Sequence, residues 1–210
     1  MDLTHWLAFA GASAILLAIP GPTVLLVISY AIGHRRRFRN ATVAGVTLGD
    51  FTAMTASMLG LGALLAASAM LFGVLKLIGA AYLIYMGVKL WRAKVPETAG
   101  EAEAADGKSQ LSVFGHVYAV TALNPKSIVF FVAFLPQFLD LTRPVAGQMA
   151  VFEATFLVLA FINASLYALL ASAARGAIRK PRVQRAANRV SGSLLIGAGV
   201  LTAAWRHKPA

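Results

Sequence analysis

The chain has 210 residues, of which 59% are hydrophobic and 13% are charged, and it carries a formal net charge of +11. Soluble domains contain about 25% charged residues, and a soluble domain of this size cannot bury so much apolar surface. The composition therefore argues against a cytosolic enzyme and a disordered chain, and the lack of cysteine excludes disulfides and thiolate metal sites.

Six apolar runs follow one another along the chain, and each is a candidate membrane helix, which needs about 20 residues. They cover residues 4–33, 41–66, 69–91, 112–139, 146–174 and 190–206, of which the last is short. The first run has no basic residue before it, so we expect a permanent helix and not a cleaved secretory signal. The polar segment 93–111 is the one long linker. We therefore expect a single integral membrane domain over residues 1–210, with one half over 1–92 and another over 112–210.

The basic residues gather in three of the segments that separate these runs, namely 34–40, 89–108 and 175–189. The positive-inside rule places such segments in the cytoplasm and, with six spans, puts both termini outside. Nucleic-acid binding would require a separate soluble basic module, and the sequence has none. The high charge therefore indicates membrane topology, with the lipid bilayer and not nucleic acid as the partner.

The two halves share a pattern of proline and acid. Pro20-Gly21-Pro22 lies in the first run and Asn124-Pro125-Lys126 in the fourth. The spacing from Pro22 to Asp50 equals that from Pro125 to Glu153. Proline inside a helix removes a donor and clashes with the preceding turn, and interrupted helices at matching positions mark the binding site in many transporters. We predict an all-α membrane protein of six transmembrane helices, arranged as two inverted three-helix repeats with the first and fourth helices broken at these motifs.

Asp50 and Glu153 are the only acids inside the predicted spans, and the free-energy cost of an acid in a membrane makes each a candidate functional residue. Lys126 is the matching cation, able to hold a substrate carboxylate or to neutralise an acid. Other interpretations remain open: a structural ion pair between Asp50 and Lys126, a protonated acid that bridges helices, or a Lys126 side chain that extends to the interface.

Amide and small residues are weaker candidates. Asn124 and Asn163 fit hydrogen-bonded helix packing at least as well as ligand binding. Gly49, with Gly45 one turn before it, favours close contact between helices. The glycines of the last run fit either internal packing or a homodimer.

The order and spacing of these motifs resemble the LysE/RhtB family of amino-acid exporters. Four stretches spread over essentially the whole chain carry the resemblance: Pro20-Gly21-Pro22, Gly45-x-x-x-Gly49-Asp50, Asn124-Pro125-Lys126 and the segment from Ile78 to Trp91. The resemblance implies a secondary-active exporter in the bacterial inner membrane that carries neutral, small polar or basic amino acids by proton antiport and uses no cofactor.

A zwitterionic amino acid presents one carboxylate and one ammonium group. Helix N-termini suit an anion, so we expect the backbone after Pro22 or Pro125, with Lys126, to hold the carboxylate. Asp50 or Glu153 would hold the ammonium and would bind a proton when the substrate leaves. The alternative is a divalent-cation transporter with both acids as oxygen ligands, which a nearby Lys126 opposes. An intramembrane aspartyl protease needs two catalytic acids and usually a Gly-x-Gly-Asp run, whereas the run here is Thr47-Leu48-Gly49-Asp50 and the second acid is Glu153. A serine type would need a motif that the sequence lacks, so we expect no enzymatic activity.

Overall fold

The computed structural model describes residues 2–19, 21–33, 37–67, 69–93, 109–140, 143–173 and 180–204. Within these ranges all regular structure is helical. The α-helices are α1 (Leu3–Ala18), α2 (Pro22–Gly33), α3 (Arg39–Ala67), α4 (Ala69–Trp91), α5 (Gln110–Ala122), α6 (Pro125–Val129), α7 (Val145–Ala173) and α9 (Pro181–Ala204). A π-helix, η1 (Phe130–Phe134), and a 3-10 helix, η2 (Leu135–Phe138), continue from α6.

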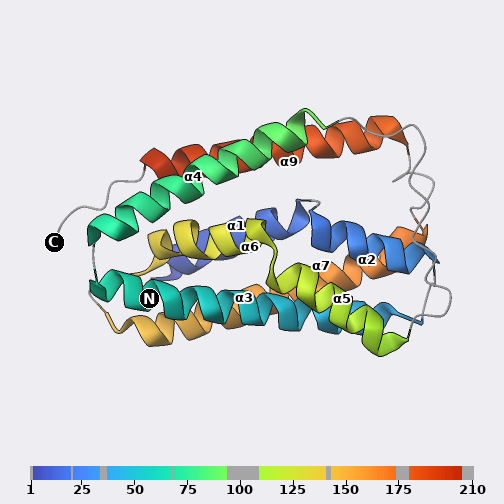
Figure 1. The fold of residues 1–210 in the computed structure, drawn as a ribbon, viewed down its shortest axis with the longest axis horizontal. Coiled ribbons are helices and arrows are strands. Elements are labelled where there is room, and N and C mark those ends of the chain that lie inside the picture. The colour runs from blue at the N-terminus through green and yellow to red at the C-terminus, as the bar shows by residue number, and fades with distance from the viewer. Residues whose placement is uncertain are drawn as a thin grey trace.

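The helices run roughly along one long axis (Figure 1). α4 and α9 lie side by side and form one layer of the bundle, while α3, α5 and α7 lie on its other side. The consecutive helices α1 and α2 lie between these layers in this view, and both pack on α7. The helices on both sides of the break therefore pack on α7, which belongs to the second half of the chain.

The predicted apolar runs agree closely with the observed helices, except for the last. α9 begins at Pro181 and not at 190. Proline is favoured in the first turn of a helix, and the Arg185 Nε donates a hydrogen bond to the Pro181 carbonyl (3.2 Å). The prediction of a short last helix is therefore wrong, because the last nine residues predicted for the preceding basic loop, 181–189, are helical.

Membrane crossing can be judged from helix length and composition within the described residues. Gly73–Trp91, Gln110–Phe138 and Val145–Ala171 are long and apolar enough to span a bilayer. A fourth span results if α1 and α2, which are bent by 56° at the break, are counted as one. α3 and α9 are about 43 and 36 Å long at about 1.5 Å per residue, but they are not among the candidates found within the described residues. The criterion thus supports up to four of the six predicted spans.

Two apolar clusters form the core of the bundle, one around α1 and the other around α2. One is rich in phenylalanine, with Phe9 packed on Phe152 (ring centroids 4.4 Å apart) and Phe131 on Phe156 (4.8 Å). The other joins α2, α3, α5 and α7 through mainly aliphatic residues such as Val27. The end of α1 belongs to the first cluster and α2 to the second, so the break lies where the two clusters meet.

Glycines allow two helix pairs to approach closely. A Cβ at Gly49 would lie 2.7 Å from the Thr121 Cβ on α5, and a Cβ at Gly192 would lie 2.5 Å from the Gly87 carbonyl on α4. Both distances are too short for a methyl group. The structure thus places Gly49 in the contact between α3 and α5, as its small-residue spacing predicts.

Candidate substrate site at two helix breaks

The first break lies between Ala18, where α1 ends, and Pro22, where α2 begins. Ile19 has an extended backbone (φ −70°, ψ 118°) that ends the helical path. Pro20 lies outside the described residues. Gly21 lies against Lys126, whose Nζ is 3.4 Å from the position that a Cβ would take. The Pro20-Gly21-Pro22 motif therefore marks a true interruption, and Lys126 from the other half lies beside it.

Four successive carbonyls at the end of α1, which lack their regular intrahelical donor, all accept hydrogen bonds from side chains of the second half. The pairs are Lys126 Nζ with the Leu16 and Ile19 oxygens (both 3.0 Å), Asn163 Nδ2 with the Leu17 oxygen (3.1 Å) and Tyr167 Oη with the Ala18 oxygen (2.9 Å). We call Lys126, Asn163 and Tyr167 the α1 cap. In an apolar medium each unpaired carbonyl would be unfavourable by several kcal/mol, so the α1 cap makes the break tolerable.

The second break lies between α5 and α6 and is closed by its own residues. The Leu123 N–H donates to the Ala119 carbonyl and the Asn124 N–H to the Thr121 carbonyl (both 3.0 Å). The Asn124 side chain accepts from the Lys126 N–H (3.1 Å) and so caps α6, with Pro125 in its first turn. Asn124 and Pro125 thus start a new helix directly after the old one ends.

The two breaks meet at Thr23, in the first turn of α2. Its hydroxyl oxygen accepts hydrogen bonds from Asn124 Nδ2 (3.2 Å) and from the Thr121 hydroxyl (3.3 Å). The N-terminus of α2 therefore faces the second break. This end of α2 also presents N–H groups that no carbonyl of the same helix can accept from.

A cavity of about 20 Å³ lies between the breaks, which is room for about one water molecule. Asp50, 2% exposed, contributes its carboxyl group, and no hydrogen bond to this group occurs within the described residues. Polar side chains from both halves also line the cavity: Thr23, Asn124, Lys126, Ser127, Asn163 and Tyr167. The remaining wall is apolar and includes Val24, Val27 and Val46. A buried acid and a buried cation therefore share one small cavity.

Glu153, the second predicted acid, lies apart from this group. It accepts a hydrogen bond from the Thr55 hydroxyl and does not line the cavity of Asp50. Thr55 is five residues beyond Asp50 on α3, which is about 7.5 Å along the helix axis. In the described ranges no three His, Asp or Glu residues form a group that could hold a metal ion. The paired use of Asp50 and Glu153 as cation ligands thus has no shared site to support it.

Sequence reasoning found Asp50, Lys126, Asn124 and Asn163, and the structure brings these four to one cavity. It missed Thr23 and Tyr167. Tyr167 follows Asn163 by four residues and so occupies the same helix face, which is a signal that the sequence contains. Thr23 follows Pro22 directly, but only the fold shows that the second break approaches it.

Comparisons with known proteins fit this arrangement. The chain is 33% identical over 210 residues to a homoserine/homoserine lactone efflux protein of Salmonella typhi, and the match covers 99% of this chain and 100% of that protein. It is 33% identical over 203 residues to an uncharacterized membrane protein of Vibrio cholerae serotype O1 (97% and 98% covered). It is 29% identical over 197 residues to a leucine efflux protein of Salmonella choleraesuis (93% and 92% covered). No solved structure matches the chain.

The match to a protein family extends over nearly the whole chain. The family described as LysE type translocator covers residues 14–204, a range that includes both helix breaks and every residue that lines the cavity. Apolar helices and relatives that are membrane and efflux proteins agree with this assignment. The chain therefore belongs to the LysE family of translocators and is a multi-pass membrane protein.

Proposed function

We propose that this protein exports amino acids across the bacterial inner membrane by proton antiport, with the cavity between the helix breaks as its substrate site. One observation carries the proposal: the Asp50 carboxyl group, without a hydrogen bond in the described structure, shares a buried cavity with Lys126. An acid in such a place is functional by default. The efflux proteins among the relatives, named for homoserine and leucine, support an amino acid as the cargo.

The charges of the cavity favour a neutral amino acid. Among the described residues of the lining, Asp50 is the one acid and Lys126 the one cation, which complements the ammonium and carboxylate of a zwitterion. In this scheme Asp50 binds the ammonium, while the N-terminus of α2 and Lys126 bind the carboxylate. A basic side chain would need a second acid, and the valine wall instead suits an aliphatic or small polar side chain.

The transport cycle requires the cavity to open, because about 20 Å³ is several times too small for an amino acid. In transporters built from inverted repeats, one repeat rocks against the other around the central site. The proposal therefore includes six spans in two such repeats. The equal length of α3 and α7, 29 residues each, and the break before each of them support it.

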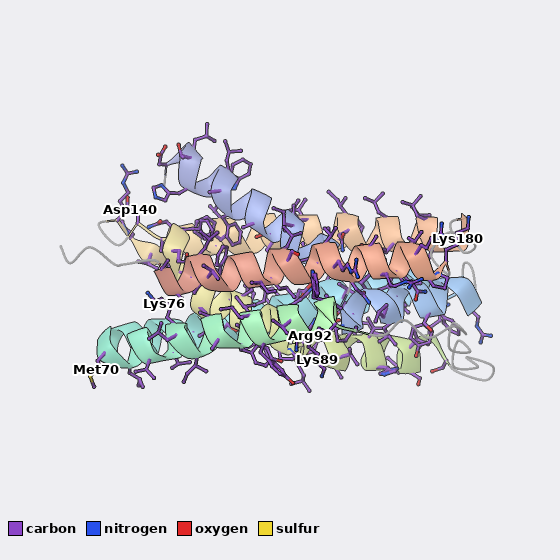
Figure 2. All side chains as sticks on the ribbon, turned by 90° about the horizontal axis from the view of Figure 1, so that it is seen from above. Met70, Lys76, Lys89, Arg92, Asp140 and Lys180 are labelled. Atoms are coloured by element: carbon purple, nitrogen blue, oxygen red, sulfur yellow. The ribbon has the colours of Figure 1, made fainter. Side chains whose placement is uncertain are left out.

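We propose the orientation in the membrane from the positions of the basic segments and the termini. Met70 and Asp140 lie at one end and Lys180 at the other, while Lys89 and Arg92 lie between them (Figure 2). The beginning of α1 and the end of α9 lie at the same end of the bundle (Figure 1). From the positive-inside rule alone we place the basic segments 34–40, 89–108 and 175–189 in the cytoplasm and both termini outside.

Proton coupling follows from competition for a single group. Asp50 binds either the ammonium of the substrate or a proton, so release of the amino acid outside leaves Asp50 free to take up a proton there. The proton then returns to the cytoplasmic side and leaves when the next substrate binds. Such exclusive binding at one carboxyl group is sufficient to couple the two movements.

An efflux screen tests this function. Cells preloaded with L-homoserine, L-leucine or L-lysine should export at least one of the neutral amino acids faster when they express the protein, and collapse of the proton gradient should stop this. Asp50→Asn should abolish the effect, while Asp2→Asn, the same change at an exposed position, should preserve it. Export that persists without a gradient would refute the antiport, and no export of any amino acid would refute the function.

A further inference from the structure

The α1 cap differs from the way in which the second break is closed. Helix ends are usually satisfied by their own following residues, and the second break follows this rule through Leu123 and Asn124. The first break instead depends on three side chains from α6 and α7. Among the described residues, the end of α1 is therefore held by side chains from the other half of the molecule. Its own chain contributes only the hydrogen bonds from the Ile19 N–H to the Ile15 and Leu16 carbonyls.

Lys126 is the central member of this cap. It is 5% exposed, and two of its three N–H donors are taken by the carbonyls of Leu16 and Ile19. Both acceptors are neutral. A carboxylate bears a full negative charge, and in a low-dielectric interior its attraction to an ammonium group exceeds that of a neutral carbonyl, so a carboxylate that enters the cavity competes well for this ammonium group.

We propose that the α1 cap is a latch that the substrate opens: the substrate carboxylate binds the Lys126 ammonium, draws it from the Leu16 and Ile19 carbonyls, and so frees α1 to move. This rests on the function proposed above. A ligand shifts a conformational equilibrium only through contacts that differ between the two states, and the Lys126–carboxylate bond is such a contact. Lys126 thus binds substrate, while Asn163 and Tyr167 are positioning residues that set how firmly α1 is held.

Asn163 and Tyr167 allow the latch to be weakened without a change of charge. They lie four residues apart on α7 and hold Leu17 and Ala18. Tyr167→Phe removes one hydrogen bond to α1 and retains the ring. Tyr85, exposed on α4, provides the matched control Tyr85→Phe. The loss of one hydrogen bond to α1 should raise the population of the open form by about two- to tenfold.

The chain has no cysteine, so a single introduced thiol reports opening without background. Ala164→Cys places it in the cavity, where Ala164 is 3% exposed, and we call this group the cavity thiol. Ile15→Cys places a control thiol on an exposed face of α1. In proteoliposomes, maleimide should label the cavity thiol faster when L-leucine or L-homoserine is present, and the control thiol at an unchanged rate.

Tyr167→Phe should raise the labelling rate of the cavity thiol without amino acid by about two- to tenfold and lower the KM for export, since less binding energy is then used to open the latch. In Lys126→Met the cavity thiol should be labelled fast whether or not amino acid is present, and the KM for export should rise. If Lys126→Met does not fold, Asn163→Leu takes its place as a second weakening of the latch and should resemble Tyr167→Phe.

Labelling and KM equal to the parent in folded Tyr167→Phe would overturn the latch, because a purely structural cap would change only the yield of folded protein. This failure differs from failure of the proposed function. If the parent exports amino acids and labelling of its cavity thiol responds to them while Tyr167→Phe behaves as the parent, only the latch is wrong. If the parent neither exports nor responds to L-leucine, L-homoserine or L-lysine, the exporter itself is refuted, and the latch with it.

Discussion

The two helix breaks differ in how the backbone groups at the end of the first helix find hydrogen-bond partners. Between α5 and α6 the chain turns on its own backbone, and Asn124 starts the next helix at once. Between α1 and α2 the carbonyls of α1 are served by Lys126, Asn163 and Tyr167 from the other half. The second break is thus a fixed bend, while the first depends on contacts that relative movement of the halves would break.

The acids that follow the two breaks also differ in their burial and hydrogen bonding. Asp50 is 2% exposed, lacks a hydrogen bond within the described residues and faces the cavity. Glu153 is partly buried and bonded to Thr55, outside the cavity. Halves that match in sequence pattern therefore differ in structure: the first contains the buried acid and the helix end that is capped, and the second contains Lys126 and the rest of the α1 cap.

The largest effect should come from removal of the acid in the first half. Asp50→Asn takes away the negative charge proposed to bind the substrate ammonium, and loss of one partner of such a buried charge pair typically costs about 2–5 kcal/mol, so we expect export to fall by at least about 30-fold. Glu153→Gln retains an oxygen that accepts the hydrogen bond from Thr55, and export should stay within about threefold of the parent. Initial rates of amino-acid export in proteoliposomes measure the effects of both substitutions. Equal loss in the two variants would remove the distinction between the acids.

A second effect concerns the close contact between α3 and α5. Gly49→Ala places a methyl group 2.7 Å from the Thr121 Cβ, and such overpacking destabilises by about 1–3 kcal/mol. Gly11→Ala, on α1 with no atom within 4 Å of its Cβ position, is the matched control and should leave stability unchanged. Thermal unfolding in detergent compares the two variants. A parent-like unfolding temperature for Gly49→Ala would show that α3 and α5 are less closely packed.

A third effect tests whether the second break is self-contained. Asn124→Ala removes the cap of α6 and the bond to Thr23, for an expected loss of about 1 kcal/mol of stability. Asn124→Ser retains a capping oxygen and should recover most of that loss. Because the second break does not hold α1, labelling of the cavity thiol in folded Asn124→Ser should match the parent. Faster labelling would mean that both breaks act as latches.

The smallest effect should come from the surroundings of Glu153. Thr55→Val removes the hydroxyl that donates to Glu153 and has no contact with the cavity of Asp50. Export should remain within about twofold, since the net value of one such hydrogen bond is about 1 kcal/mol and it does not touch the substrate. A tenfold loss in transport assays would place Glu153 in the transport path.

Much of the helical plan could be predicted from sequence because long apolar runs and interior prolines are strong local signals. The prolines at 22 and 125 mark both breaks correctly. The start of α9 was missed because a basic segment can be loop or helix, and only its packing along α4 decides. The π-helix at Phe130–Phe134 has no local signal in the sequence, and within it Ala133 packs closely on Gly79 of α4.

The candidate site was predictable only in part. Charged residues are rare inside the predicted spans, and this rarity identified Asp50, Glu153 and Lys126 as candidates. The different surroundings of the two acids depend on which residues face them across helices, which spacing along one chain does not encode. For the same reason the sequence favoured a substrate role for Lys126 and did not predict that its ammonium holds the end of α1.

The central claim, that one carboxyl group binds substrate and proton in turn, can be tested by proton release. Purified protein in weakly buffered detergent receives the amino acid found in the efflux screen, and the change in pH is measured. At a pH where Asp50 is protonated, the account predicts release of about one proton per bound amino acid in the parent and in Glu153→Gln, and none in Asp50→Asn. Binding without proton release at every pH, or unchanged release in Asp50→Asn, would contradict it.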